Sequence, residues 1–410
     1  MRAILKQTSW LFFAQVLTRA IGFFYIIYLA RILGVSDFGL YIVALAYFSI
    51  LSSVADFGFN RFLIREVAID KSKAPELLWN IVMLRLTLTS ILFAIFSIIL
   101  YLLDPDKMRV SLILLATLAI LPQSVAFAFD AIFVAKQKLQ FSAAALFVSS
   151  LFTTLAGLYL VGNGFGPLGA VNALIVGQVA YVTILIIFLY RHQSLVLSRV
   201  HLTVIKKIII GSLPYGLLSV LGLLYFRIDA ILLSYMKGSF ETGIYGAAFK
   251  FLEAVTFIPS AFSLALLPVL ARLHESSVKD VKRLYFNSFK VMLVLGLVVW
   301  LGYVLILPEI IKAVLPNYLS SIGAIRILSL AIPFMLIHVP AVSVLLSTDK
   351  FLKQVLILSV LALVFNIAAN LIFIPQFGFI AASWVTVASE VLSFVIFFLF
   401  VKNRILDKVR

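Results

Sequence analysis

The chain lacks cysteine and is short of charge. Its 410 residues include no cysteine and only four histidines, and charged residues make up 12% of the total. The absence of cysteine excludes disulfides and thiolate metal sites. A soluble globular domain carries about 25% charged residues. The low charged fraction therefore excludes an ordinary soluble domain.

The histidines are scattered along the chain, at His192, His201, His274 and His338. No two of them have the close spacing of a zinc-binding motif. We therefore expect neither a metal site nor a cofactor.

Hydrophobic residues are abundant, at 63% of the chain. They form apolar runs of about 18 residues or more, the length that crosses a bilayer as a helix. The short segments of alternating polarity that a membrane β-barrel needs are not visible. The sequence predicts an all-α membrane protein with twelve transmembrane helices, at 9–30, 38–59, 77–103, 110–135, 141–161, 168–190, 208–236, 243–271, 289–307, 318–347, 354–374 and 379–401.

The distribution of basic residues predicts the orientation of these spans. Of the 33 lysines and arginines, 23 lie in the termini and the even-numbered connections, and 5 lie in the odd-numbered connections. Basic residues concentrate on the cytoplasmic side of membrane proteins. We therefore expect a multi-pass protein of the cell (inner) membrane with both termini in the cytoplasm. The net charge of +16 then faces anionic membrane lipid, and no nucleic-acid partner is needed to explain it.

An internal repeat divides the chain. Gly34, Asp37, Gly39 and Tyr41 recur 204 positions later as Gly238, Glu241, Gly243 and Tyr245. Each set lies between the first and second span of a six-span half. The glycine allows a tight turn, and we expect the acid to cap the N-terminus of the second span.

A second match supports the repeat. "FGPLGAVNALIVGQV" from Phe165 and "FGFIAASWVTVASEV" from Phe377 align at a shift of 212 positions. Six spans are an even number, so the two halves run parallel, as in transporters with a path between two lobes. We predict an N-terminal six-helix lobe at 1–200 and a C-terminal six-helix lobe at 201–410, around a central cavity.

Ionisable residues inside the predicted spans are candidates for function, because each costs about 2.5–3.5 kcal/mol at the centre of a bilayer. Lys250 and Glu253 are three positions apart and can pair along one helix face. Arg227 and Asp229 point to different sides of their helix, so each needs another partner or a wet cavity. Arg19 lies near mid-depth, and a structural ion pair with Asp56 is one explanation for it.

The alternative explanation is functional. Arg19 and Arg227 lie on the first span of each half, where their guanidinium groups would bind a phosphate or pyrophosphate in the cavity, with Arg85 as a weaker candidate. Buried acids are candidates for coupling transport to an ion: Asp229, Asp56 and Glu390.

The segment "ARILGVSDFGLYIVALAYFSILSSVADFGFNRFLIREVA" from Ala30 resembles the N-terminal signature of polysaccharide-export oligosaccharide flippases. These belong to a superfamily with the multidrug and toxin extruders and the lipid II flippases. "RIDAILLSYMKGSFETGIYGAAFKFLE" from Arg227 resembles the opening of their second lobe. The resemblance implies alternating access that moves a lipid-linked oligosaccharide, on a polyprenyl or dolichyl (pyro)phosphate, to the outer leaflet. Its implied partners are the lipid-linked glycan, membrane lipid, glycosyltransferases and a glycan polymerase or ligase.

"TRAIGFF" from Thr18 resembles the first-helix arginine motif of the lipid II flippases, with Arg19 at the cavity arginine. Their second arginine is replaced here by Tyr25, and about two of their helices have no counterpart. These departures argue against lipid II itself and leave the wider class of lipid-linked oligosaccharides.

Other functions stay open at this point. A multidrug-extruder-like exporter would share the architecture and would favour acids in its first-lobe cavity. A membrane glycan polymerase or ligase would need a catalytic group on an outer loop, where the predicted loops are short. A structural scaffold is a further alternative.

Overall fold

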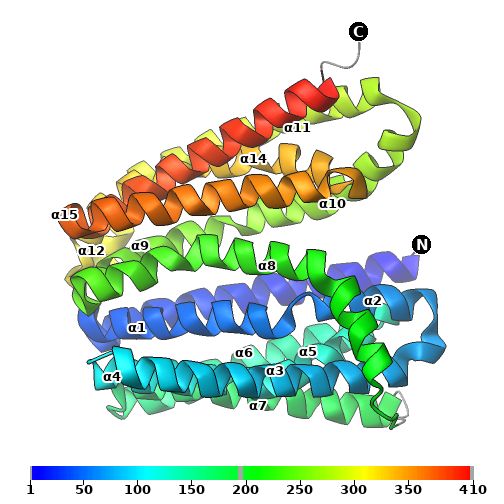
Figure 1. Ribbon diagram of the computed structural model, residues 1–410. Coiled ribbons are helices and arrows are strands. Elements are labelled where there is room, and N and C mark those ends of the chain that lie inside the picture. The colour runs from blue at the N-terminus through cyan, green and yellow to red at the C-terminus, as the bar shows by residue number, and fades with distance from the viewer. Residues whose placement is uncertain (1, 193–196, 407–410) are drawn as a thin grey trace. The chain divides into compact units, whose positions relative to one another are not determined.

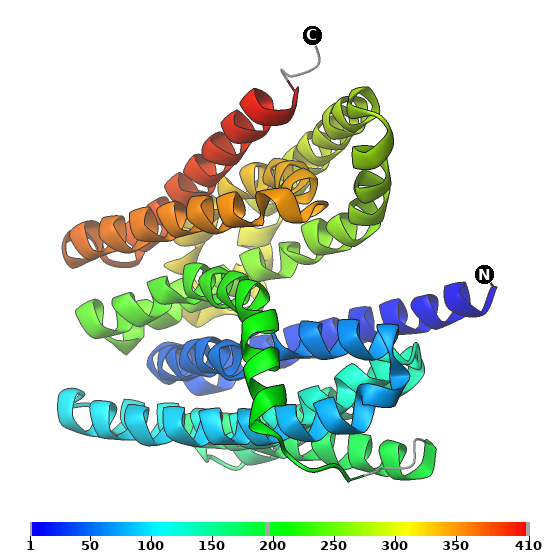
Figure 2. The ribbon, with the colours of Figure 1, turned by 45° about the vertical axis from the view of Figure 1, so that its right-hand side comes forward.

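The computed structural model describes residues 2–192 and 197–406. Within these ranges the chain forms helices joined by short connections, and no strand is present. Figures 1 and 2 show the chain as a series of helices, several of them long. The predicted all-α class is therefore confirmed. The chain divides into two compact units, which we call unit 1 (Met1–Leu223) and unit 2 (Leu224–Arg410).

Unit 1 contains seven complete α-helices and one 3₁₀ turn in its described residues: α1 (Arg2–Asp56), α2 (Phe59–Ile69), η1 (Lys71–Lys73), α3 (Ala74–Leu103), α4 (Lys107–Leu118), α5 (Ile120–Ala135), α6 (Leu139–Gly162) and α7 (Gly166–His192). Its core is apolar, with large side chains such as Phe59, Leu63, Ile81 and Phe133 almost fully buried. Helices α6 and α7 pack against each other, and both contact α1.

Helix α8 (Leu202–Lys237) carries the boundary between the two units. Its first part belongs to unit 1, where Gly216 lies against the backbone of Phe57 and Gly211 lies against the Phe62 ring. A Cβ at either glycine would collide with these groups, so the close approach depends on glycine. The predicted boundary, at 200/201, precedes this helix, whereas the compact units meet within it.

Unit 2 contains the rest of α8 and the elements α9 (Ser239–Val255), α10 (Phe257–Ser276), α11 (Val278–Leu305), α12 (Leu307–Val314), η2 (Pro316–Tyr318), α13 (Ser321–Ser329), α14 (Ala331–Leu346), η3 (Asp349–Phe351), α15 (Leu352–Val401) and η4, a π-helical turn (Lys402–Leu406). Helix α14 packs against α10, α11 and α15. This packing buries apolar residues such as Leu336, Val344 and Leu345.

Ten stretches of the described chain are long and apolar enough to cross a membrane. Two of them, Val16–Ile69 and Leu352–Ile405, have 54 residues each. At about 1.5 Å per residue, a straight helix of that length would measure about 80 Å, against about 30 Å for the hydrocarbon core. Each stretch is instead broken at a glycine, Gly34 in α1 and Gly378 in α15. Both ribbon views show the two arms of α1, and those of α15, running back along each other (Figures 1 and 2). The chain is therefore a multi-pass membrane protein.

The backbone repeats where the sequence repeats. Gly34 has φ 72° and ψ 178°, and its match Gly238 has φ 85° and ψ −179°. In the second pair, Gly166 has φ 54° and Gly378 has φ 56°. Side chains other than glycine rarely adopt such positive φ values. The matched glycines therefore make matched turns, and each matched pair has one glycine in each unit.

Of the two repeated acids, Glu241 does not cap the helix that the sequence predicted. Helix α9 has Gly238 at its N-cap and no side-chain cap hydrogen bond. Glu241 instead accepts a hydrogen bond from the backbone N–H of Phe379, at 2.9 Å, where α15 restarts after Gly378. Its counterpart Asp37 lies beside Gly166, at the start of α7. The predicted cap on the second span is therefore wrong for Glu241. The acid satisfies the first helical N–H after a distant turn, which sequence neighbours alone cannot indicate.

Candidate functional site

A buried carboxylate forms the centre of a polar cluster in unit 2. Asp229 on α8 is 2% exposed. Its Oδ2 accepts hydrogen bonds from Tyr245 on α9, at 2.9 Å, and from Thr386 on α15, at 3.0 Å. Its Oδ1 accepts one from the amide of Asn370 on α15, at 2.8 Å. Three helices thus converge on one carboxylate inside an apolar bundle.

The cluster continues along α15 through amides and hydroxyls. The Asn370 amide also donates to Asn366 Oδ1, at 3.2 Å, and the Asn366 amide donates to Ser389 Oγ, at 3.2 Å. The Oδ1 of Asn370 is buried and has no hydrogen-bond partner among the described residues. Leaving such an acceptor unpaired costs about 1–3 kcal/mol. The cluster therefore has one more acceptor than its own donors satisfy.

This oxygen set suits a small hard cation or a proton. One carboxylate, amide oxygens and hydroxyl oxygens are the ligands that hard cations take in proteins. No group of three or more histidines, cysteines or acids gathers anywhere in the described chain. The single negative charge of Asp229 matches one monovalent positive charge.

Glu390, also predicted as a coupling acid, lies on α15 one turn after Thr386 and is 5% exposed. Its Oε1 accepts a hydrogen bond from the Tyr225 hydroxyl on α8, at 3.1 Å. Unit 2 thus places both of its predicted coupling acids between α8 and α15. The third predicted coupling acid, Asp56, belongs to unit 1.

Arg227 forms a second charged group in unit 2. Its Nη2 lies 2.6 Å from Glu253 Oε1 and its Nη1 lies 3.3 Å from Glu253 Oε2, and Lys250 Nζ lies 2.8 Å from the same Oε2. The predicted pairing of Lys250 with Glu253 is confirmed, and Arg227 has the separate partner that it needed. Two positive charges share one carboxylate, so the triad has a net charge of +1.

The Nε of Arg227 is left over from this arrangement. It is buried and has no hydrogen-bond partner among the described residues, while the Arg227 side chain as a whole is 16% exposed. A guanidinium with a free N–H and an excess of positive charge around it can donate to a further anionic oxygen.

Arg85 occupies a different environment from the one predicted for it. It is 1% exposed, inside unit 1. Its guanidinium donates to the Asp56 carboxylate, to Asn60 Oδ1 at 2.9 Å and to the carbonyl oxygen of Ser124 at 2.9 Å. Arg85, the weaker phosphate-binding candidate of the sequence, is thus a buried side chain whose hydrogen bonds join α1, α2, α3 and α5. Its partner Asp56 is committed to the same ion pair.

Arg19 lies in the first arm of α1, before the turn at Gly34, and its side chain is exposed. Asp56, its suggested structural partner, pairs with Arg85. Among the predicted residues, the structure brings Arg85 together with Asp56 in unit 1. It places Asp229 and Glu390 on the same pair of helices in unit 2.

Sequence reasoning missed the neutral members of the Asp229 cluster. A usable signal was present in α15, where Asn366 and Asn370 are four positions apart, and so are Thr386 and Glu390. Residues four apart share a helix face. Two polar pairs with this spacing in apolar spans indicate one polar face on each arm of α15.

Three comparisons with known proteins bear on this geometry. No curated protein matches the chain. The profile of the family described as "Polysaccharide biosynthesis protein" matches residues 4–274, more than half of the chain. Among solved structures, an inward-facing multidrug resistance MATE family transporter of the MOP superfamily has a TM-score of 0.77 and 16% identity, covering 96% of each chain.

Two further solved structures share the fold. The lipid II flippase MurJ, in an inward closed conformation, has a TM-score of 0.74 and 16% identity, covering 96% of this chain and 87% of its own. A MOP superfamily transporter from Pyrococcus furiosus, whose title describes a binding pocket of reverse polarity, has a TM-score of 0.66 and 16% identity, covering 98% and 95%. Repeated glycine turns, charges buried in membrane helices and a profile match over residues 4–274 lead to one conclusion: this chain belongs to the polysaccharide biosynthesis protein family and has the fold of the MATE transporters and the lipid II flippase.

Proposed function

We propose that this protein is a flippase that moves a lipid-linked oligosaccharide from the cytoplasmic to the outer leaflet by alternating access. Arg227, Lys250 and Glu253 carry the proposal, because the triad keeps one excess positive charge and a free guanidinium N–H. A charge at bilayer depth is costly unless it serves a partner or a pathway. An anionic (pyro)phosphate supplies the missing negative charge and an acceptor for Arg227 Nε.

Arg19 of unit 1 is a further phosphate-binding candidate in this proposal, on the strength of the "TRAIGFF" motif and its exposed side chain. Arg85 is left out of the site, because its donors are engaged with Asp56, Asn60 and Ser124. The proposal further includes twelve spans in two six-helix halves. It also includes cytoplasmic termini in the cell membrane, and glycosyltransferases and a glycan polymerase or ligase as partners in the pathway.

Energy for export comes, in this proposal, from a monovalent cation or a proton bound at Asp229. The unpaired Asn370 Oδ1 and the hydroxyl of Thr386 complete an oxygen set around that carboxylate. The competing source is the membrane potential, which supplies about 2.3 kcal/mol per charge per 100 mV to an anionic headgroup leaving a negative cytoplasm.

The test is leaflet exchange of a fluorescent polyprenyl-pyrophosphate oligosaccharide in proteoliposomes, followed by quenching of the label on the outside. Loss of one charge-assisted hydrogen bond is worth about 1.5–3 kcal/mol, so Arg227→Ala should slow exchange about 10- to 100-fold. Arg326→Ala, which removes an exposed arginine of the same unit, should leave the rate unchanged. Wild-type rates in an Arg19→Ala, Arg227→Ala double variant would exclude the proposed site.

The same vesicles separate the two energy sources. A sodium or proton gradient should accelerate the wild type and have no effect on Asp229→Asn, which keeps the shape of the side chain and removes its charge. If both proteins respond only to a potassium–valinomycin potential, the membrane potential drives export and Asp229 has another role.

The second candidate function is cation-coupled export of cationic drugs, favoured by the shared MATE fold. The net positive charge of the Arg227 triad disfavours a cationic substrate. Efflux of a cationic dye from the same proteoliposomes, with no exchange of the lipid-linked glycan, would decide for this alternative.

A further inference from the structure

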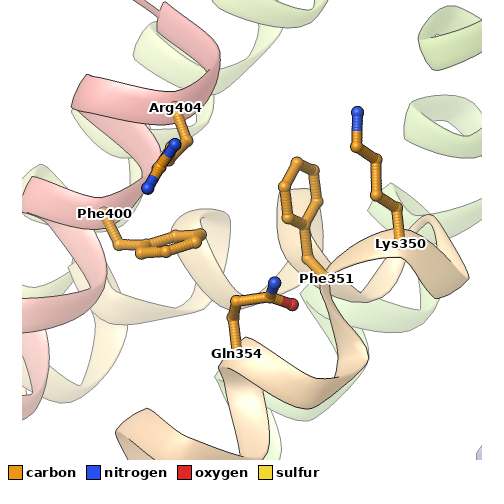
Figure 3. A pocket seen from close by; sticks show the side chains of 5 residues that line it. All are labelled: Lys350, Phe351, Gln354, Phe400 and Arg404. Carbon is orange, nitrogen blue, oxygen red and sulfur yellow. The ribbon is translucent and has the colours of Figure 1, made fainter.

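A separate cavity lies in unit 2 where the two ends of α15 come together. It encloses about 330 Å³ and is lined by Lys350 and Phe351 of η3, Gln354 of α15, Phe400 near the end of α15, and Arg404 of η4. Figure 3 shows the two phenylalanine rings on opposite sides of the space, Gln354 below it, and Lys350 and Arg404 at its rim. None of these residues belongs to the site proposed for the glycan or for the coupling ion.

The charges of the lining residues favour an anionic ligand. Its five side chains carry two positive charges and no negative charge. Lys350 Nζ lies 5.7 Å from the centre of the Phe351 ring, and the Phe351 and Phe400 rings meet edge to face with centres 6.1 Å apart. The contact between Lys350 and the Phe351 ring is a cation–π interaction, which holds the lysine beside the two aromatic rings.

A helix terminus adds to the positive potential. Helix α15 begins at Leu352, its N-cap is Phe351, and that cap supplies no side-chain hydrogen bond. The N-terminus of a helix presents backbone N–H groups to an anion, and the helix dipole favours one there. The long first arm of α15 therefore directs its positive end toward the residues that line the cavity.

The Gln354 amide fixes the turn that forms this wall. With its oxygen and nitrogen placed to satisfy their neighbours, its nitrogen donates to the carbonyl oxygens of Lys350 and Phe351, at 3.2 Å each. Its oxygen then takes the position at which Figure 3 draws the amide nitrogen. A ligand with an anionic group for the rim and a hydroxyl for this oxygen fits the lining.

The place of the cavity in the chain indicates where that ligand comes from. The apolar stretch Leu352–Ile405 begins and ends at the cavity, so the lining lies at the depth where lipid headgroups meet water. Basic residues in juxtamembrane positions attract anionic lipids there. The volume is near the lower limit of about 300–1,000 Å³ for ligand pockets, which suits one headgroup and is too small for an oligosaccharide.

We propose that this cavity binds the headgroup of one anionic phospholipid with a hydroxylated headgroup, such as phosphatidylglycerol. Lys350, Arg404 and the first N–H groups of α15 contact the phosphate, Gln354 accepts from a headgroup hydroxyl, and the wall formed by the two phenylalanine rings packs against one side of the glycerol. The site is independent of the proposed transport function and holds whether or not the protein moves a glycan.

The experiment is native mass spectrometry of the full-length detergent-purified protein, titrated with dioleoyl-phosphatidylglycerol or dioleoyl-phosphatidylcholine. We expect one tightly held phosphatidylglycerol and no comparable site for phosphatidylcholine. In Lys350→Ala, Arg404→Ala, affinity for that lipid should fall at least about tenfold, since two charge-assisted hydrogen bonds are lost. Lys350→Arg, Arg404→Lys keeps both charges and should retain most of the affinity.

The matched control is Lys279→Ala, Arg283→Ala, which removes the same charge from exposed positions on α11 and should bind like the wild type. Equal loss in the control and in the cavity variant would attribute binding to net charge and overturn the site. An unchanged wild-type preference in the cavity variant would overturn it as well. Displacement of the lipid by millimolar inorganic phosphate would identify a free-anion site in place of a lipid site.

Discussion

At the scale of single residues, buried positive charges lie beside a carboxylate of their own compact unit. Arg85 pairs with Asp56 in unit 1, and Arg227 and Lys250 share Glu253 in unit 2. Among the described residues Asp229 has no cationic partner, and it is held by neutral donors. This difference separates a structural ion pair from a group that is suited to bind a cation.

Removing Asp56 tests the structural pair. Asp56→Ala leaves the fully buried Arg85 guanidinium without its carboxylate, and breaking a buried pair costs about 3–5 kcal/mol. The thermal unfolding midpoint of the detergent-purified protein should fall steeply. Asp56→Asn, which keeps an acceptor for the guanidinium, should fall less.

Asp70→Ala is the control for this measurement. Asp70 is exposed to solvent between α2 and η1, and hydrogen bonds from the Ser72 hydroxyl and backbone lower the pKa of its carboxyl. A lowered pKa adds stability at neutral pH that is lost as the pH falls, so the small effect of Asp70→Ala should disappear in acid. An equal loss of stability in Asp56→Ala and Asp70→Ala would contradict the assignment of Asp56 as the buried partner.

At the scale of elements, glycine turns convert long apolar segments into antiparallel helix pairs. Gly34 and Gly378 break 54-residue stretches, and the first backbone N–H after Gly378 donates a hydrogen bond to the Glu241 carboxylate. The turn and the acid therefore act together, although they are far apart in the chain. In both units an acid lies beside a glycine turn. This shared arrangement explains why glycines and acids are the residue types that repeat in the sequence.

Gly378→Ala tests this pairing. The substitution strains a position with φ 56°, and its Cβ would collide with the Glu241 carboxylate. Backbone strain of this kind costs about 1–3 kcal/mol, and displacement of the carboxylate adds to it. The unfolding midpoint should fall clearly. Gly222→Ala is the control, since Gly222 lies in α8 with open space around it. A midpoint for Gly378→Ala as high as that of Gly222→Ala would exclude a structural role for the turn.

At the scale of the whole molecule, membrane insertion follows from composition and charge distribution. The chain has no cysteine, so a single introduced cysteine reports the side of the membrane without background labelling. We choose Asn163, exposed after α6, and Ser72, exposed in η1. The basic-residue distribution places the first outside and the second inside the cell.

In intact cells, a membrane-impermeant maleimide should label Asn163→Cys and leave Ser72→Cys unlabelled until the membrane is permeabilised. The reverse pattern would place the termini outside, and labelling of both from one side would contradict an odd number of crossings between them. The cysteine-free parent is the control for non-specific labelling.

The sequence by itself determined the class of this protein and its repeat. Because backbone hydrogen bonds must be satisfied within the segment in lipid, apolar runs of membrane length predict helices. Matched glycines predict matched turns. The pair of Lys250 with Glu253 followed from helical spacing alone, because residues three apart on a helix always lie close together.

Only the tertiary structure decided which distant residues meet. It joined Arg85 to Asp56 and Asn60, Asp229 to Tyr245, Asn370 and Thr386, and Glu241 to the turn at Gly378. These partners lie on different helices, and helix packing can bring any of several polar faces together. Local spacing therefore predicted the charged residues that needed partners, while the packing of whole helices selected the partners themselves.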